Sequence, residues 1–342
     1  MGLLSGSDRK ELAPQPLTRK ELEWYHHPAY LDILATASHA SDLTPAALDM
    51  GLGTPDCPVF PGLLDYVRLA GGGTLTATRR LLAGDALRAF NPSGGYHHAA
   101  AGAAAGFCYI NDVVIALMEM TRQGKRVAFI DLDVHHGEGV QTAFYNRSDV
   151  LMISLHEDGR FIFPGTGAVD EIGEGDGRGY TVNIPLPVGT YDVVYENAFM
   201  QAAWPVLNAY EPDLIVVELG MDGLAGDPLA HMHLTNNVYA DVLKKLTGTG
   251  KQILTVGGGG YNVEQTVRGW ALCWSVLCED AADEWNIGMG GVMLENTDWI
   301  GGLRDRTLLS DAGRHDTIAD DVENVIQQIR KTVFPIHRLA SQ

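Results

Sequence analysis

Cysteine is scarce in this 342-residue chain, and its spacing is uninformative. The four thiols are Cys57, Cys108, Cys273 and Cys278, which form no CxxC pair and lie mostly among apolar residues. A disulfide framework and a zinc–thiolate site are therefore both disfavoured. We expect reduced core thiols and a cytoplasmic location.

Long apolar runs and positive charge are also lacking. The sequence contains no run of about 18 apolar residues, so it predicts no membrane-spanning helix. The segment 1–16 is polar and lacks the apolar stretch of a secretory signal. Lysine and arginine number 24 against 43 acidic residues, a net charge of −19. Such a surface repels nucleic acid, so we expect no direct contact with nucleic acid or membrane. Acidity suits a cationic substrate, but it also serves solubility alone.

No repeat or low-complexity linker divides the chain, and we expect one α/β domain over residues 1–342. Continuous apolar runs predict buried strands of a parallel sheet; these are Arg126–Asp131, Val150–Leu155, Tyr180–Ile184, Asp213–Glu218 and Gln252–Val256. Amphipathic stretches predict helices at Asn111–Arg122, Tyr195–Tyr210, Asn236–Leu246 and Asn262–Cys278. Pro205 should interrupt the second helix, and Asn262 with Gln265 predicts a capping box on the last.

Polar clusters follow the predicted strands. They are Asp131–Glu138, His156, Met221–Asp227 and Gly257–Tyr261. In open α/β sheets, ligands bind outside the carboxyl ends of the strands. Separate segments therefore bring Asp, His and Tyr side chains to one edge of the sheet.

The segment after the first of these strands predicts a metal site. Residues two apart in extended chain point the same way, so Asp133 and His135 can present a carboxylate and an imidazole together. Asp222, at the end of another strand, can supply a third ligand and leave a position open for water, as in catalytic zinc sites. A single strand-end aspartate more often caps a helix or turn. The combination favours a metal.

Five ordered motifs resemble the histone deacetylase family, most closely its class I enzymes and their bacterial acetoin-utilisation relatives. They are Gly94–His98, Gly106–Asp112, Asp131–Glu138, Phe163–Gly167 and Gly257–Asn262, and the likeness extends from Glu21 to Cys278. The resemblance implies a single domain with a mostly parallel, eight-stranded sheet flanked by helices. Outside the matched region, we expect residues 1–16 to be flexible. Residues 279–342 match only loosely and are expected to form a helical extension of the same domain, with a helix at Val322–Ile329.

The resemblance also implies the metals. One zinc ion would be held by Asp133, His135 and Asp222. A structural potassium or sodium ion would lie nearby, held by Asp131, Asp133, His135, Ser154 and Leu155. A second would be held by backbone oxygens around Phe144, Arg147, Val150 and Tyr180.

The catalytic groups follow from the same resemblance. His98 would be the principal general base and acid, and His97 would orient the water and stabilise charge. Asp131 would support His97, and Glu138 would support His98. Glu138 stands where class I enzymes usually carry aspartate, so we expect activity with an altered pH profile. Tyr261 would donate a hydrogen bond to the oxyanion.

The substrate channel is assigned in the same way. Phe107 and Phe163 would form its walls beside Gly106, and Leu229 would occupy the position of the usual channel methionine or leucine. Asp56 would accept hydrogen bonds from the substrate's backbone amides at the rim. The implied activity is zinc-dependent removal of acetyl groups from lysine side chains of proteins, releasing acetate.

Three alternatives are weighed against this prediction. Arginase-like enzymes of the superfamily hold two manganese ions, but Gly137 and Leu224 stand where their extra carboxylates would be. The substrate can instead be a small acetylated amine or polyamine. A catalytically silent acyl-lysine-binding protein is disfavoured by the intact ligand set and Tyr261. The sequence indicates neither the preferred acyl group nor the oligomeric state.

Overall fold

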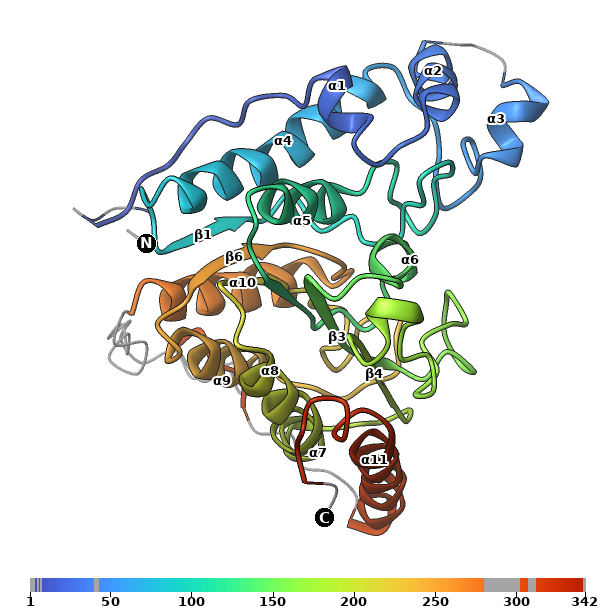
Figure 1. Ribbon diagram of the computed structural model, residues 1–342. Helices are drawn as coiled ribbons and strands as arrows, with labels where there is room; N and C mark the ends of the chain where they lie inside the picture. Colours follow the sequence, from blue (N-terminus) through green and yellow to red (C-terminus); the bar gives the residue numbers. More distant parts are fainter. Residues whose placement is uncertain are drawn as a thin grey trace, which may run out of the picture.

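A computed structural model describes residues 4, 6, 8–39, 43–279, 302–306 and 312–340, except for the side chains of 312–315. Its centre is one parallel sheet with the strand order β1-β6-β5-β2-β3-β4 (Figure 1). The strands are β1 (Arg88–Asn91), β2 (Val127–Asp131), β3 (Val150–Glu157), β4 (Thr181–Leu186), β5 (Leu214–Glu218) and β6 (Gln252–Val256).

The expectation of eight strands is wrong, because the sheet has six within the described residues. The five predicted strands are all present, and β1 was missed. Residues 8–18, the continuously described part of the N-terminal segment, add no strand: they run along α4 (Leu63–Leu82), where the Leu17 N–H donates to the Arg68 carbonyl at 2.9 Å. Their backbone groups are therefore partly satisfied by a helix rather than by the sheet edge.

Both faces of the sheet are covered, as continuous apolar strands require. Every residue of β2 is buried, and its side chains alternate between two cores: Ala128 and Ile130 pack in one, Val127 and Phe129 in the other. This alternation confirms the predicted doubly covered sheet.

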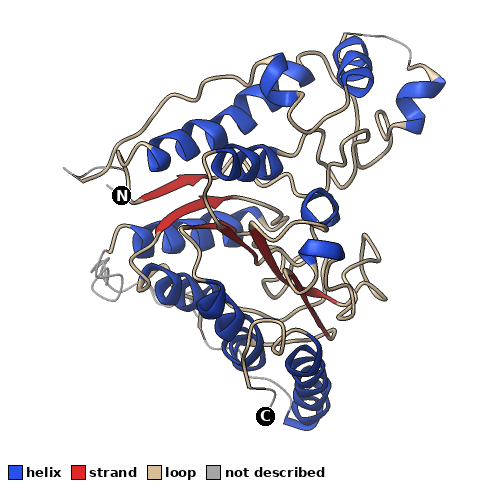
Figure 2. Ribbon diagram, in the orientation of Figure 1, coloured by secondary structure: helices blue, strands red, loops and turns tan. Residues whose placement is uncertain are grey.

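Helices form a layer on each side of the sheet (Figure 2). One layer contains α4, α5 (Asp112–Arg122) and α6 (Glu138–Phe144). The other contains α7 (Asp192–Ala198), α8 (Trp204–Tyr210), α9 (Asn236–Thr247), α10 (Val263–Leu277) and α11 (Ala312–Thr332). A third core joins α4 to the short helices α1 (Arg19–Leu22), α2 (Pro28–Ala37) and α3 (Pro45–Asp49).

Local signals around the helices are mostly confirmed. The predicted helix Tyr195–Tyr210 is interrupted by a π-helical turn, Phe199–Ala203, and Pro205 lies in the first turn of α8, where its missing N–H is tolerated. Asn262 caps α10 by accepting from the Gln265 N–H at 3.4 Å. The other half of the capping box is replaced, since the Gln265 side chain donates to the Ala225 carbonyl.

The C-terminal helix belongs to the same core as the sheet. Val322, Ile326 and Ile329 of α11 are fully buried and pack in the core that contains α7. Between Glu279 and α11, only residues 302–306 are described. The four cysteines form no disulfide. Among the described helices, none is long and apolar enough to cross a membrane.

Candidate active site

The candidate site lies at the carboxyl ends of the central strands. In the parallel register, Asp131 at the end of β2 lies beside Ser154 of β3 and Glu218 of β5. The chain leaving β2 carries Asp133 and His135, and the chain leaving β5 carries Asp222. One edge of the sheet therefore collects the acidic and imidazole groups, as predicted from the strand ends.

Asp133, His135 and Asp222 converge on one point. Each offers a ligand atom within 4.8 Å of the other two, and all three side chains are buried. His135 Nδ1 lies 3.2 Å from Asp133 Oδ1 and 3.0 Å from Asp222 Oδ2. The second oxygens are held by backbone: Asp133 Oδ2 accepts from Gly259 N–H at 2.7 Å, and Asp222 Oδ1 from Val134 N–H at 3.0 Å.

This donor set fits a divalent cation. Two carboxylates and one imidazole are ligands that zinc accepts, and three protein ligands leave a position open. Burial lowers the pKa of His135, but hydrogen bonds with Asp133 and Asp222 outweigh it and raise the pKa to about 10. The site therefore strongly favours a positive charge at its centre.

A second metal of the arginase type does not fit. A Cβ atom on Gly137 would lie 2.6 Å from Asp131 Oδ2, so a carboxylate side chain has no room there. Leu224 is a buried core residue. The geometry favours one metal, as the sequence predicts.

The predicted pairs of histidine and carboxylate are in contact. His97 Nδ1 lies 2.9 Å from Asp131 Oδ2, and His98 Nδ1 lies 2.6 Å from Glu138 Oε2. The two Nε2 atoms are 3.0 Å apart. Ionised carboxylates can only accept hydrogen bonds, so both Nδ1 atoms must carry a hydrogen. The contact between the two Nε2 atoms requires a further hydrogen on one of them. Three ring protons on two imidazoles make one of them a cation.

The environment decides which histidine is the cation. Burial lowers the pKa of His97, but Glu218, Asp131 and Asp133 outweigh it and raise the pKa well above its usual value. Burial and then the neighbouring His97 lower the pKa of His98 to about 4. His97 is therefore the cationic member, and His98 Nε2 is the unprotonated nitrogen.

Glu218 is the residue that the sequence analysis missed. Its side chain is fully buried, its Oε1 lies 3.2 Å from His97 Nδ1, and neither oxygen has a hydrogen-bond partner. Burial raises its pKa well above the usual value. The signal was available: Glu218 is an ionisable residue ending an otherwise apolar strand, level with Asp131.

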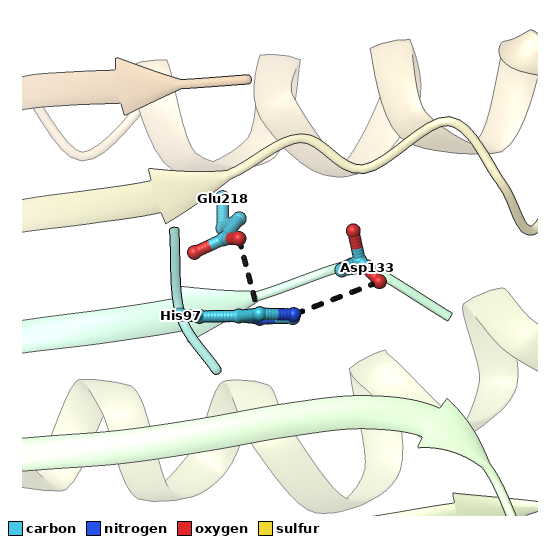
Figure 3. A group of neighbouring side chains, drawn as sticks. All are labelled: His97, Asp133 and Glu218. Carbon is cyan, nitrogen blue, oxygen red and sulfur yellow. Dashed lines mark ion pairs between the residues drawn. The ribbon is translucent and has the colours of Figure 1, made fainter. Parts of the chain in front are cut away.

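His97, Asp133 and Glu218 also lie within metal-binding distance of one another. However, Glu218 approaches His97 at Nδ1, whereas Asp133 Oδ1 lies 4.0 Å from Nε2 (Figure 3). One ion cannot bind both nitrogens of one ring. This group therefore places two acidic side chains at opposite nitrogens of His97 and does not form a metal site.

Two glycines bring the walls of the site together. Gly95, just before the histidine pair, has φ +99°, and a Cβ there would lie 2.6 Å from Gly258 N. Gly106 has φ +51°, and a Cβ there would lie 2.4 Å from His98 Cδ2. Side chains at these positions would push the histidine loop away from its neighbours.

Tyr261 follows the glycine run 257–260 and lies at the wall of the site. Its ring centroid is 5.7 Å from that of Phe107, and its N–H donates to Asp227 Oδ2 at 2.7 Å. Burial, followed by the charges of Asp222 and Asp133, raises the pKa of the hydroxyl. Tyr261 therefore stays protonated and can donate a hydrogen bond.

The predicted channel residues are apolar but open to solvent. Phe107, Phe163 and Leu229 are 46%, 45% and 43% exposed, too open for core positions. The Phe163 ring lies 5.0 Å from that of His98, so one predicted wall borders the histidine pair. Asp56 Oδ2 accepts from the Gly106 N–H at 3.4 Å, which places it near the other wall.

The two sites for monovalent cations stay predictions. Ser154 lies beside Asp131 in the sheet, and its hydroxyl is 2.8 Å from His156 Nδ1. In the second group, Arg147 N–H donates to the Phe144 carbonyl, and the Tyr180 carbonyl accepts from Met152 N–H.

Comparisons with known proteins agree with this geometry. The model of the histone deacetylase domain matches residues 3–277. Histone deacetylase 8 of Xenopus tropicalis is 38% identical over 277 residues, covering 81% of this chain and 73% of the relative. The acetoin utilization protein AcuC of Bacillus subtilis is 40% identical over 271 residues, covering 77% and 70%.

Solved structures give the same answer. An HDAC homologue from Aquifex aeolicus matches with a TM-score of 0.80 at 30% identity, covering 92% of this chain and 87% of that chain. A complex of an HDAC homologue with SAHA matches equally well. Together with the domain match, these similarities show that the chain belongs to the histone deacetylase family.

Proposed function

We propose that this chain is a zinc-dependent deacetylase that removes acetyl groups from lysine side chains of peptides or proteins. The observation that carries the proposal is the convergence of Asp133, His135 and Asp222 beside the pair His97 and His98. A metal position and a base–acid pair at one sheet edge are what amide hydrolysis needs.

Asp133, His135 and Asp222 would hold the zinc ion. When bound, zinc supplies a Lewis acid that polarises the acyl carbonyl and lowers the pKa of water. The backbone N–H groups of Gly259 and Val134 hold one oxygen of each carboxylate, which would leave the other oxygen of each free to bind the ion.

The histidines divide the proton transfers. His98 donates its Nδ1–H to Glu138 and keeps Nε2 unprotonated. Once water takes the place of the His97 Nε2–H at this nitrogen, Nε2 can accept a proton from the water. The same nitrogen then returns the proton to the departing amine. His97, cationic between Asp131 and Glu218, stabilises the negative charge that develops on the attacked carbonyl.

Tyr261 would complete the oxyanion site. Its hydroxyl stays protonated and lies on the wall shared with Phe107. A donor of this kind typically contributes about 10²–10³-fold to the rate. Phe107, Phe163 and Leu229 would enclose the methylene chain of lysine, and Asp56 would meet the peptide backbone.

The test measures zinc content and turnover together. We expect one zinc per chain, hydrolysis of acetyl-lysine peptides in preference to acetylated diamines, and a rate about 10²–10³-fold lower in Tyr261→Phe at unchanged zinc content. Tyr210→Phe is the matched control, because its hydroxyl bonds to the Ser148 carbonyl at the opposite end of the sheet. A zinc-loaded wild type that releases acetate from neither substrate would contradict the proposal.

A further inference from the structure

One carboxylate holds two parts of the site that come from different segments. Asp227 lies in the connection between β5 and α9 and is 7% exposed. Its Oδ2 accepts from the Tyr261 N–H at 2.7 Å, and its Oδ1 accepts from the Leu229 N–H at 2.9 Å. The predicted oxyanion donor and a predicted channel residue therefore share one anchor.

The backbone before Tyr261 needs such an anchor. Gly258 and Gly260 have φ +125° and +141°. Glycine has access to many other backbone conformations, so these two residues do not fix the path of the chain by themselves. Two carboxylates hold the run: Asp133 accepts from Gly259, and Asp227 accepts from Tyr261. Asp133 belongs to the metal group and holds Gly259, whereas Asp227 bonds to the backbone of Tyr261 directly.

The segment 227–231 is held at its other end as well. Glu157, fully buried at the end of β3, accepts from the His231 N–H at 2.9 Å and lies 2.7 Å from His231 Nδ1. Leu229 lies between these two anchors. A shift of Asp227 would therefore be transmitted mainly to Tyr261, because Glu157 still restrains Leu229 from the other side.

We propose that Asp227 is a positioning residue that sets where the Tyr261 hydroxyl meets the substrate. The inference rests on the proposed function of Tyr261. Two backbone donors need two acceptor oxygens, which a carboxylate has and an amide lacks. Asp227→Asn keeps the volume but turns an NH₂ group toward one of the donors.

The test is a double-mutant cycle with Tyr261→Phe on the zinc-loaded protein. We expect Asp227→Asn to lower kcat about 10-fold, with KM changed less than about 2-fold, because a misplaced oxyanion donor acts on the transition state. In the Tyr261→Phe background the same change should lower kcat less than about 2-fold. Asp227→Ser, which offers one oxygen, carries the same prediction if the asparagine variant does not fold.

Asp192→Asn is the matched control. Asp192 lies in α7 and accepts at 2.7 Å from the N–H of Thr235, which ends the connection between β5 and α9. Within the described hydrogen bonds, it contacts neither Tyr261 nor Leu229. We expect its kcat to equal that of the wild type. An equal loss for Asp227→Asn in both tyrosine backgrounds, or no loss in either, would overturn the inference.

A binding measurement separates this inference from the proposed function. An aliphatic hydroxamate, a metal-chelating mimic of acyl-lysine, probes the site without turnover. If the wild type hydrolyses no acetyl-lysine peptide or acetylated diamine, the proposed function fails, and the cycle is measured on the hydroxamate Kd. Non-additive losses there support the positioning role of Asp227, and additive losses contradict it.

Discussion

His97 and His98 are neighbours in sequence, yet their surroundings differ in burial and charge. His97 is enclosed by Asp131 and Glu218, both inaccessible to solvent, whereas His98 has one partner, Glu138, whose side chain is 25% exposed. The pKa is raised for the first ring and lowered for the second. Identical side chains therefore have pKa values shifted in opposite directions, because the number and burial of their carboxylate partners differ.

Alanine substitution of each histidine is the most severe test of this difference. We expect His98→Ala to lower kcat by about 10³–10⁴-fold, because it removes the proton acceptor, and His97→Ala by about 10²-fold, because it removes a stabilising charge. Steady-state kinetics at matched zinc content measure both. Equal losses would contradict the division of tasks.

Glu138→Gln should have a smaller effect and a directional pH signature. Glu138 raises the pKa of His98 through its hydrogen bond and charge, so its neutral replacement should lower that pKa further. A base works only when deprotonated, and its activity falls as the pH drops through its pKa. The acidic limb of the kcat profile should therefore move to lower pH, with kcat reduced about 10-fold because the weaker base accepts a proton less readily.

Glu119→Gln on α5 is the control for this pH profile, because the Glu119 carboxylate pairs with Arg79 of α4 at 3.7 Å and not with a histidine. That control should leave the acidic limb where the wild type has it. An acidic limb displaced to higher pH by Glu138→Gln would show that Glu138 does not act through His98.

Glu218→Gln should change stability more than rate. Glutamine keeps the size of the side chain but cannot ionise, so the change removes a titration that contributes at most about 1.4 kcal/mol per pH unit to the free energy of unfolding. Burial raises the pKa of Glu218 in the folded chain, so the wild type loses stability as the pH rises above the unfolded pKa. The advantage of the variant should therefore be larger at pH 8 than at pH 5.

Urea denaturation of the zinc-loaded proteins at the two pH values measures this. Glu196→Gln, an exposed change on α7, is the control and should leave stability unchanged. An advantage that is larger at pH 5 would contradict a raised pKa for Glu218.

The strands that are buried on both faces could be predicted from the sequence. β2 and β5 are continuous apolar runs because helices cover the sheet on each side, and their ends locate Asp131 and Asp222. β1 was missed because its four residues, Arg88–Asn91, are only half-buried at the sheet edge and carry no apolar run. The family motifs then supplied the roles of the histidines, which spacing alone does not reveal.

The sequence could not predict the long-range register of the strands or which side chains accept from backbone N–H groups. Glu218 matters because it lies level with Asp131 across two strands that are far apart in the chain. Asp227 matters because its two oxygens meet the N–H groups of Leu229 and Tyr261, and backbone donors leave no residue-specific trace in a sequence. Both contacts follow from how the segments pack.

The close approach of Gly106 to His98 restricts how the proposed substrate channel can be widened. Since no side chain fits between that glycine and the imidazole, the wall on this side cannot be rebuilt without displacing His98. Leu229, another predicted channel residue, is 43% exposed, so its side chain can be replaced without the loss of a core contact. Selection or engineering of acyl-chain scope should therefore concentrate its changes there.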